Sequence, residues 1–281
     1  MKKITRAQIL LALRAIKNKV SAQFAMLHWS PYSRLFLKSD DAPWVLTGEM
    51  KSLGAVCKQL NIQVANSNWL PYANNQSIFY ASRYELLGSR AWERKQQNRF
   101  ATAYFHGRPG SEEPIFSEMH KVLCISHSHI HRVQVSHTEM QDIVLSSGID
   151  PHKVFLIPIG IDISAFQLQT FESRKTARTK FGIPESAVVI GSFQKDGSGW
   201  GEGNEPKRIK GPDIFLNVIK HLRERVSEIF VLLTGPARGY VINGLRAMDV
   251  PYKHIMLDEY TDINSAYHCL DLYIVASRQE G

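Results

Sequence analysis

The sequence has few cysteines and no long apolar run. Its three cysteines, Cys57, Cys124 and Cys269, lie far apart in a chain of 281 residues and lack the spacing of metal ligands. A disulfide framework is therefore disfavoured, and a reducing cytoplasmic compartment suits the chain better. No stretch is apolar for long enough to cross a bilayer. We therefore expect a cytoplasmic protein without membrane-spanning segments.

The N-terminus also lacks the pattern of a cleaved signal peptide. Arg14 and Lys17 interrupt the apolar run that follows the first basic residues, and no cleavage-like end comes after it. Residues 4–25 instead predict an amphipathic helix. Packing of this helix on the protein core is favoured over a membrane surface, because its apolar stripe carries no tryptophan. Peripheral contact with a membrane stays open as the alternative.

The composition lacks any signature of a disordered or fibrous protein. The chain is 44% hydrophobic and 21% charged, which is usual for globular proteins, and it is long enough for two domains. Lysine and arginine outnumber aspartate and glutamate by 34 to 26, a formal charge of +8. This excess favours an anionic partner such as a nucleotide sugar, an anionic lipid or a nucleic acid, and charge alone does not choose among them.

Short apolar runs alternate with helical patterns along most of the chain. The predicted strands lie at 44–46, 62–65, 77–81, 100–105, 133–135, 153–157, 187–193, 229–233, 254–257 and 272–275. The predicted helices lie at 49–60, 114–129, 170–180 and 261–270, with a further helix that a capping box of Ser136 and Glu139 begins and Gly148 ends. This alternation predicts an α/β protein.

Two charged segments have a simple structural interpretation. The basic run at 170–180 predicts a solvated helix, and a nucleic-acid-binding face is disfavoured because aromatic residues are not interleaved. His127, His129 and His131 lie two residues apart near a helix end, where side chains point in different directions and do not converge on one metal ion. No Asp-x-Asp metal motif is evident either. We therefore expect no metal site.

Polar residues follow the last apolar run of the chain. Residues 272–275 predict a buried parallel strand, and Ser277, Arg278 and Glu280 come directly after it. Open α/β sheets bind ligands at the carboxyl ends of their strands. An ordinary solvated loop is the alternative for this stretch taken alone.

A loop rich in both glycine and basic residues follows the strand predicted at 187–193. Four glycines lie between residues 197 and 203, and the loop ends in Lys210-Gly211-Pro-Asp before a helix. Glycines allow a backbone to approach a ligand, and a helix N-terminus with nearby cations favours a diphosphate. The sequence therefore predicts a phosphate site with Lys195, Lys207, Arg208 and Lys210 as candidate ligands. A flexible surface loop is the alternative.

Several of these segments together resemble family-four retaining glycosyltransferases, which have the two-domain GT-B fold. The resemblance rests on Asp271 to Gly281, on the Ile-Pro-Ile-Gly-Ile-Asp segment at 157–162, and on Lys210-Gly211. It implies two Rossmann-like domains facing a cleft, an acceptor-side domain at 1–170 and a nucleotide-sugar donor domain at 171–281. The second domain is expected to be incomplete, because the second glutamate of the family's Glu-x7-Glu motif would fall beyond Gly281.

The same resemblance assigns roles to individual residues. It implies that Lys195, Arg208, Lys210, Gly211, Gly235, Glu280 and Gly281 bind the donor, and that His106 and Glu280 are the catalytic residues. His106 follows a predicted strand in the first domain, where an ordinary structural histidine is the alternative. Ser192 stands where the family usually has arginine, so the residue that supplies this charge is open. Arg238, after the strand at 229–233, is either a neighbour of the nucleotide or a surface residue at a helix start.

The implied activity is hexosyl transfer from a nucleotide-diphosphate sugar to a glycan or lipid-linked acceptor, with retention and without a metal or other cofactor. Fixed cations offset the charge that builds on the leaving diphosphate, as a metal ion would. Polysaccharide or glycolipid synthesis is the commonest setting, and residues 1–281 alone are expected to be inactive. A nucleotide-sugar epimerase of the same fold and a non-catalytic anion- or nucleic-acid-binding protein are the alternatives.

Overall fold

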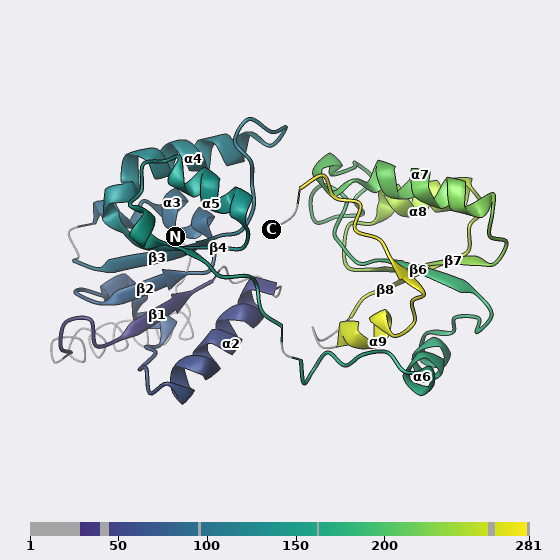
Figure 1. Cartoon of the computed structure of the whole chain (residues 1–281), viewed down its shortest axis with the longest axis horizontal. Coiled ribbons are helices and arrows are strands. Elements are labelled where there is room, and N and C mark those ends of the chain that lie inside the picture. Colours follow the sequence, from purple (N-terminus) through teal and green to yellow (C-terminus); the bar gives the residue numbers. More distant parts are fainter. Residues whose placement is uncertain (1–28, 40–44, 95–96, 162, 258–261, 280–281) are drawn as a thin grey trace, which may run out of the picture. The chain divides into compact units, whose positions relative to one another are not determined.

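The computed structural model describes residues 29–39, 45–94, 97–161, 163–257 and 262–279, in two compact units (Figure 1). The chain passes from the first unit to the second between Ile159 and Gly160. The predicted boundary after residue 170 had assigned the intervening segment to the first domain, whereas its contacts place it in the second unit. The predicted helix at 4–25, Glu280 and Gly281 lie outside the described residues.

A five-stranded parallel sheet forms the centre of the first unit, in the order β1-β2-β3-β4-β5. Figure 1 shows α3, α4 and α5 on one face of this sheet and α2 on the other. The core is built from strand residues that are fully buried, such as Phe36, Ile130 and Val133. The strands are β1 (Leu35–Lys38), β2 (Ser77–Tyr80), β3 (Arg99–Tyr104), β4 (Ile130–Val135) and β5 (Val154–Leu156). The helices are α2 (Val45–Gln59), α3 (Arg83–Ser89), α4 (Pro114–Ser126) and α5 (Thr138–Leu145), with short 3-10 turns η1 (Ser67–Tyr72), η2 (Ala91–Glu93), η3 (His127–His129) and η4 (Pro151–Lys153).

The second unit contains a four-stranded parallel sheet in the order β8-β7-β6-β9. Helices α7 and α8 cover one face, and α6 and α9 cover the other (Figure 1). The strands are β6 (Val188–Ser192), β7 (Ile229–Thr234), β8 (Tyr252–Ile255) and β9 (Leu272–Tyr273). The helices are α6 (Phe171–Phe181), η5 (Arg208–Lys210), α7 (Pro212–Arg223), α8 (Gly239–Ala247) and α9 (Ile263–Tyr267). Both units therefore confirm the predicted α/β class with parallel sheets.

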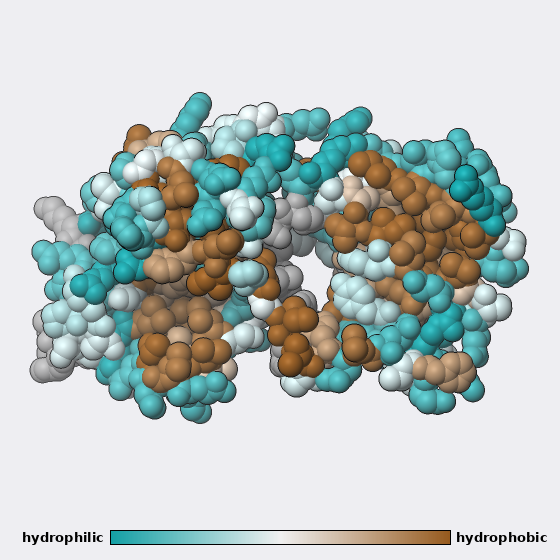
Figure 2. Space-filling view, viewed as in Figure 1, coloured by the Kyte–Doolittle hydropathy of each residue, from teal (hydrophilic) through white to brown (hydrophobic). Residues whose placement is uncertain are grey.

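The terminal strand differs from the prediction. Residues 272–275 read as a central strand covered on both faces, but β9 spans only two residues and pairs with β6 alone among the described strands. Leu272 is 48% exposed and Val275 is 53% exposed. An apolar run has the same composition in an edge strand as in a central one, so the sequence did not separate the two. Figure 2 shows apolar side chains reaching the surface on the face it draws.

The strand predicted at 62–65 does not form: among these residues only Val64 pairs, in an isolated parallel bridge with Leu35.

Two further predictions in the first unit are wrong. The strand predicted at 44–46 falls on the start of α2, and the strand that precedes this helix is β1. The capping box of Ser136 and Glu139 does not form, because His137 is the N-cap residue of α5 and makes no side-chain cap. The Ser136 hydroxyl donates to the Phe105 carbonyl at 3.0 Å, and Glu139 pairs with Arg108. Both side chains form tertiary contacts and therefore do not cap the helix.

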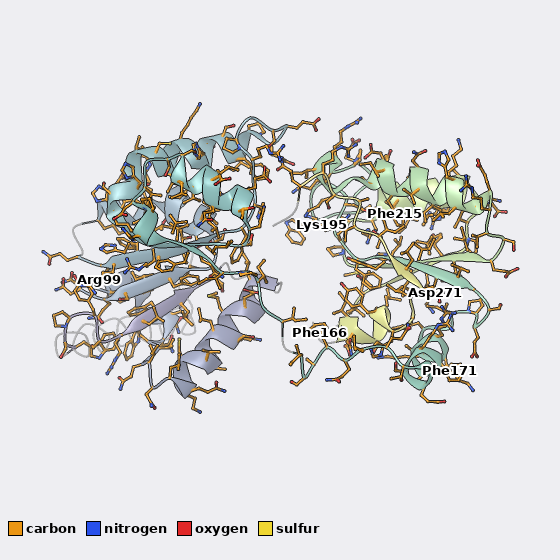
Figure 3. The ribbon with its side chains drawn as sticks, in the orientation of Figure 1. Arg99, Phe166, Phe171, Lys195, Phe215 and Asp271 are labelled. Atoms are coloured by element: carbon orange, nitrogen blue, oxygen red, sulfur yellow. The ribbon has the colours of Figure 1, made fainter. Side chains whose placement is uncertain are left out.

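Helix α6 is joined to β9 by charged residues, which the prediction of a solvated helix did not include. Arg178 is 1% exposed and its guanidinium donates to Asp271 at 2.6 Å, while Arg174 donates to the other Asp271 oxygen at 2.8 Å. Burial raises the pKa of Asp271, but hydrogen bonds from Val189 N and from these arginines outweigh burial and hold that pKa below its usual value. Asp271, labelled in Figure 3, thus fixes the strand that leads to the predicted site.

Candidate functional site

Three of the predicted motifs meet at one edge of the second sheet. Gln194, just after β6, donates from Nε2 to the Lys210 carbonyl at 2.8 Å. Its Oε1 accepts a hydrogen bond of 2.9 Å from the Ser277 hydroxyl, beyond β9. One side chain therefore joins the glycine-rich loop and the Lys-Gly pair at its end to the Ser-Arg turn, which lies far away in the sequence. Nothing in the sequence distinguished Gln194 from an ordinary loop residue.

Arg278 holds the Ser-Arg turn against the start of α7. Its backbone N–H donates to the Ile209 carbonyl at 2.8 Å, and its guanidinium donates to the Arg208 carbonyl at 2.6 Å. The same guanidinium donates to both oxygens of Asp213, at 3.0 and 2.7 Å. The hydrogen bond from Arg278 is the main reason that the pKa of Asp213 lies below its usual value. Arg278 therefore positions the backbone of the site, and most of its donors are already used.

Gly211 is required where Lys210 enters the site. Its φ is +63°, in the left-handed region, and a Cβ at this position would overlap the Ala276 carbonyl. A backbone carbonyl does not move aside as a side-chain tip does, so residues with a side chain are excluded. The Lys210-Gly211 pair is thereby held against the end of β9 and leads directly into α7, whose first residue is Pro212.

Two of the four loop glycines pack against the chain that precedes α8. Gly197 and Gly203 pack on the backbone of Ala237, so tightly that a Cβ at either position would overlap it. The Glu202 and Gly203 carbonyls accept hydrogen bonds from Gly239 N and Tyr240 N, at 2.7 and 2.9 Å. These contacts satisfy the first N–H groups of α8. Two of the four glycines thus serve loop packing.

A buried ion pair lies beneath the loop and was not predicted. Arg238 and Asp196 are each 1% exposed, and two Arg238 nitrogens donate to the two Asp196 oxygens, both at 3.0 Å. The guanidinium also donates to the carbonyls of Ser192 and Thr234, at 2.6 and 2.9 Å, and to the Ser192 hydroxyl at 3.1 Å. Burial raises the pKa of Asp196, and the Arg238 charge opposes that shift.

The contacts of Arg238 decide whether it is a surface residue, but not which residue supplies the charge expected at Ser192. Arg238 is not a surface residue, so that interpretation is wrong. Its guanidinium contacts Ser192, the position at which the resemblance expects arginine, but every one of these contacts is internal and the Asp196 carboxylate balances the charge. Arg238 therefore shapes the end of β6 and does not present a free cation there.

The other cations of the loop are not buried: Lys195, Lys207 and Lys210 are partly exposed and Arg208 is exposed. Lys195 Nζ lies 3.9 Å from the centre of the Trp200 ring, a cation–π geometry. Burial, and then repulsion from Lys207, lowers the pKa of Lys195. The first turn of α7 follows Arg208 and Lys210 directly. Neighbouring lysines that repel each other, next to a helix N-terminus, are suited to an anion carrying more than one charge.

The remaining predicted residues lie in separate places. Gly235 follows β7 with φ +81° and open space at its Cβ position, and its carbonyl is 2.7 Å from His254 Nε2. His106 lies in the first unit, exposed after β3, with its ring 5.8 Å from the Phe116 ring and 6.2 Å from the Tyr84 ring. No cluster of three or more metal-ligating side chains occurs in the described ranges. No described helix is long and apolar enough to span a membrane.

Solved structures have folds similar to that of this chain. HepE from Anabaena in complex with UDP-glucose matches with a TM-score of 0.63 at 15% identity, over 87% of this chain and 73% of that chain. A glycosyltransferase from Rickettsia africae matches with a TM-score of 0.55 at 15% identity, over 89% of this chain and 74% of its own. The fold is GT-B.

A third solved structure with the GT-B fold also matches, whereas the comparisons of sequence find no match. Sucrose-phosphate synthase from Thermosynechococcus elongatus matches with a TM-score of 0.54 at 12% identity, over 72% of this chain and 50% of that chain. No family model and no curated protein matches the sequence. At these identities the likeness defines the fold, which confirms the GT-B prediction, and the chemistry must be argued from the site itself.

Proposed function

We propose that this chain is a glycosyltransferase that binds a nucleotide-diphosphate sugar in its second unit. The observation that carries the proposal is the joining of Lys210-Gly211, the loop after β6 and the Ser-Arg turn through Gln194 and Arg278. This places cations and a helix N-terminus at the carboxyl end of a parallel sheet, where α/β folds bind phosphates. HepE, a structure of the same fold, was solved with UDP-glucose.

The finer proposal follows the resemblance to family four. Lys195, Arg208 and Lys210 would bind the diphosphate, Gly211 and Gly235 would let it approach the backbone, and Glu280 and Gly281 would position the sugar. The fixed charges would offset the negative charge of the leaving group, so transfer would need no metal ion. Retention is what the resemblance implies. His106 of the first unit would face the donor sugar, and the acceptor would be a glycan or a lipid-linked sugar.

Calorimetry with UDP-glucose tests this proposal. Binding is measured before turnover because it tests the donor site without an acceptor. Lys210→Ala removes a charge-assisted contact and should weaken binding by about tenfold or more. Lys220→Ala is the matched control, because Lys220 is an exposed lysine in the last turn of α7, at the opposite end of that helix from Lys210. Equal affinities for the two variants would contradict the assignment of Lys210.

A nucleotide-sugar epimerase of the same fold is the second candidate, since it would bind the same donor through the same cations. Incubation with UDP-glucose and no acceptor separates the two activities. An epimerase would yield a second UDP-hexose, whereas a transferase would leave the sugar unchanged or release it slowly by hydrolysis. UDP-sugar binding with neither reaction would favour a non-catalytic binding role.

A further inference from the structure

The first unit contains a buried arginine without an acidic partner. Arg83, the first residue of α3, is 2% exposed. Its guanidinium carbon lies 4.4 Å from the centre of the Tyr84 ring, 4.2 Å from that of Tyr104 and 5.6 Å from that of Phe116. Across the described part of the chain no carboxylate forms an ion pair with it. An aromatic cage therefore surrounds the charge, and nothing described neutralises it.

Hydrogen-bonding groups in this cage are also unused. Arg83 donates to the Tyr84 hydroxyl at 2.8 Å, but Arg83 Nε and the Tyr104 hydroxyl are buried without any hydrogen-bond partner. Burying a charge and its donors without a partner is unfavourable, and contact with aromatic faces offsets only part of that cost. Burial accordingly lowers the pKa of Arg83. Two unused donors around one cation call for a ligand that only accepts hydrogen bonds and carries negative charge.

The cover of this cage is the short loop at 106–111. Gly107, with φ +103°, lies so close to the guanidinium that a Cβ there would overlap Arg83 and Phe116. The loop is tied down on its outer side by the exposed Arg108–Glu139 pair and by a 2.8 Å hydrogen bond from Gly110 N to the Ser117 hydroxyl. Exposed ion pairs contribute little to stability. A displacement of residues 106–111, which lie between β3 and α4, is the movement by which a ligand would reach Arg83.

We propose that Arg83 and Tyr104 form a binding site for a phosphoryl group, which enters when the loop at 106–111 is displaced. The Arg83 guanidinium would supply the charge and its Nε–H a hydrogen bond, and the Tyr104 hydroxyl would donate a second one. Because the site lies beside His106 in the first unit, the group would belong to the acceptor, and this last assignment rests on the proposed function. The acceptor would then be a phosphorylated sugar or a phosphate-linked lipid.

A titration with inorganic phosphate, followed by NMR of the arginine Nε–H resonances, tests this site directly. The Arg83 resonance, assigned from its loss in Arg83→Lys, should shift saturably. Arg99 is the internal control, because it lies at the opposite end of β3, exposed and 3.8 Å over the Tyr32 ring (Figure 3). Equal responses of Arg83 and Arg99, or no response of Arg83, would overturn the proposal. A larger response to acetate than to phosphate would overturn the phosphoryl assignment.

Tyr104→Phe provides a variant that should fold normally. The hydroxyl has no partner in the structure, so its removal should leave the melting temperature unchanged while phosphate affinity at Arg83 falls about tenfold. Unchanged affinity would overturn the role of Tyr104. The UDP-glucose experiment reports on the second unit, so the two proposals fail separately. A phosphate response in Lys210→Ala equal to that of the wild type would place the anion at Arg83 and not at the donor loop.

Discussion

Two arginines are buried to the same degree in the two units, and their surroundings are opposite. Arg238 in the second unit has its guanidinium bound to both oxygens of Asp196, to two carbonyls and to a hydroxyl. Arg83 in the first unit has aromatic faces around it and one hydrogen bond to a phenol. A buried arginine whose donors are all used is a structural element, whereas one with unused donors has the capacity to bind a ligand.

Breaking the Arg238–Asp196 ion pair should have the largest effect on stability. Asp196→Ala leaves the Arg238 charge buried and uncompensated, which should lower the stability of the second unit by about 3–5 kcal/mol. Hydrogen exchange of the β6 and β7 amides measures this, because it reports on the second unit without assuming that the two units unfold together.

The matched control removes a carboxylate from an exposed pair of the same unit. Asp213→Ala breaks the contact with Arg278, whose side chain is 40% exposed, and should lower stability by about 1 kcal/mol or less. Equal losses for Asp196→Ala and Asp213→Ala would mean that burial does not decide the contribution of these pairs.

Substitution of a glycine that faces the backbone should have an intermediate effect on stability. Gly107 faces a side chain, whereas Gly211 faces the Ala276 carbonyl. Gly211→Ala should cost about 1–3 kcal/mol and weaken UDP-glucose binding, because the Ser-Arg turn must move away. Gly199→Ala is the control, since Gly199 has a similar φ of +70° and no neighbour within 4 Å. Calorimetric affinities that fall equally in both variants would show that only φ matters.

Acid should reveal the smallest of these effects. The folded-state pKa of Asp271 is lowered, so its contribution to stability is complete above its unfolded pKa and is lost as pH falls through the folded value. Between about pH 5 and pH 2 the second unit should lose about 1 kcal/mol or less from this group. Asp271→Asn should remove that part of the pH dependence, as followed by denaturant unfolding with β6 amides as the probe. Arg83 has no carboxylate to protonate, so its surroundings should not respond in this range.

The sequence predicted the long buried strands well, missed β1, and predicted the charged contacts poorly, for physical reasons. Runs such as Val188–Ser192 and Ile229–Thr234 are apolar enough to identify buried strands without tertiary information. Arg238 and Asp196 pair across 42 residues, and no local pattern marks a charged residue that folding will bury.

The glycines and cations of the site were likewise predicted only where a local sequence pattern marks them. Lys210-Gly211 was singled out because Lys-Gly-Pro-Asp between a predicted strand and a predicted helix is a local pattern. The packing of Gly197 and Gly203 on Ala237 depends on a turn more than thirty residues away. The roles of Lys195, Arg208, Gly235, Glu280 and His106 stay predictions, because they depend on a ligand and on residues beyond the local sequence.

The contact between Lys195 and Trp200 gives the second unit an optical signal of its own. Trp200 is the only tryptophan after residue 92 in the sequence, and its side chain is 66% exposed. An anion that draws the Lys195 ammonium away from the indole changes the field at the ring, and with it the colour and yield of its fluorescence. With the four earlier tryptophans replaced by phenylalanine, emission from Trp200 would follow occupancy of the loop in real time.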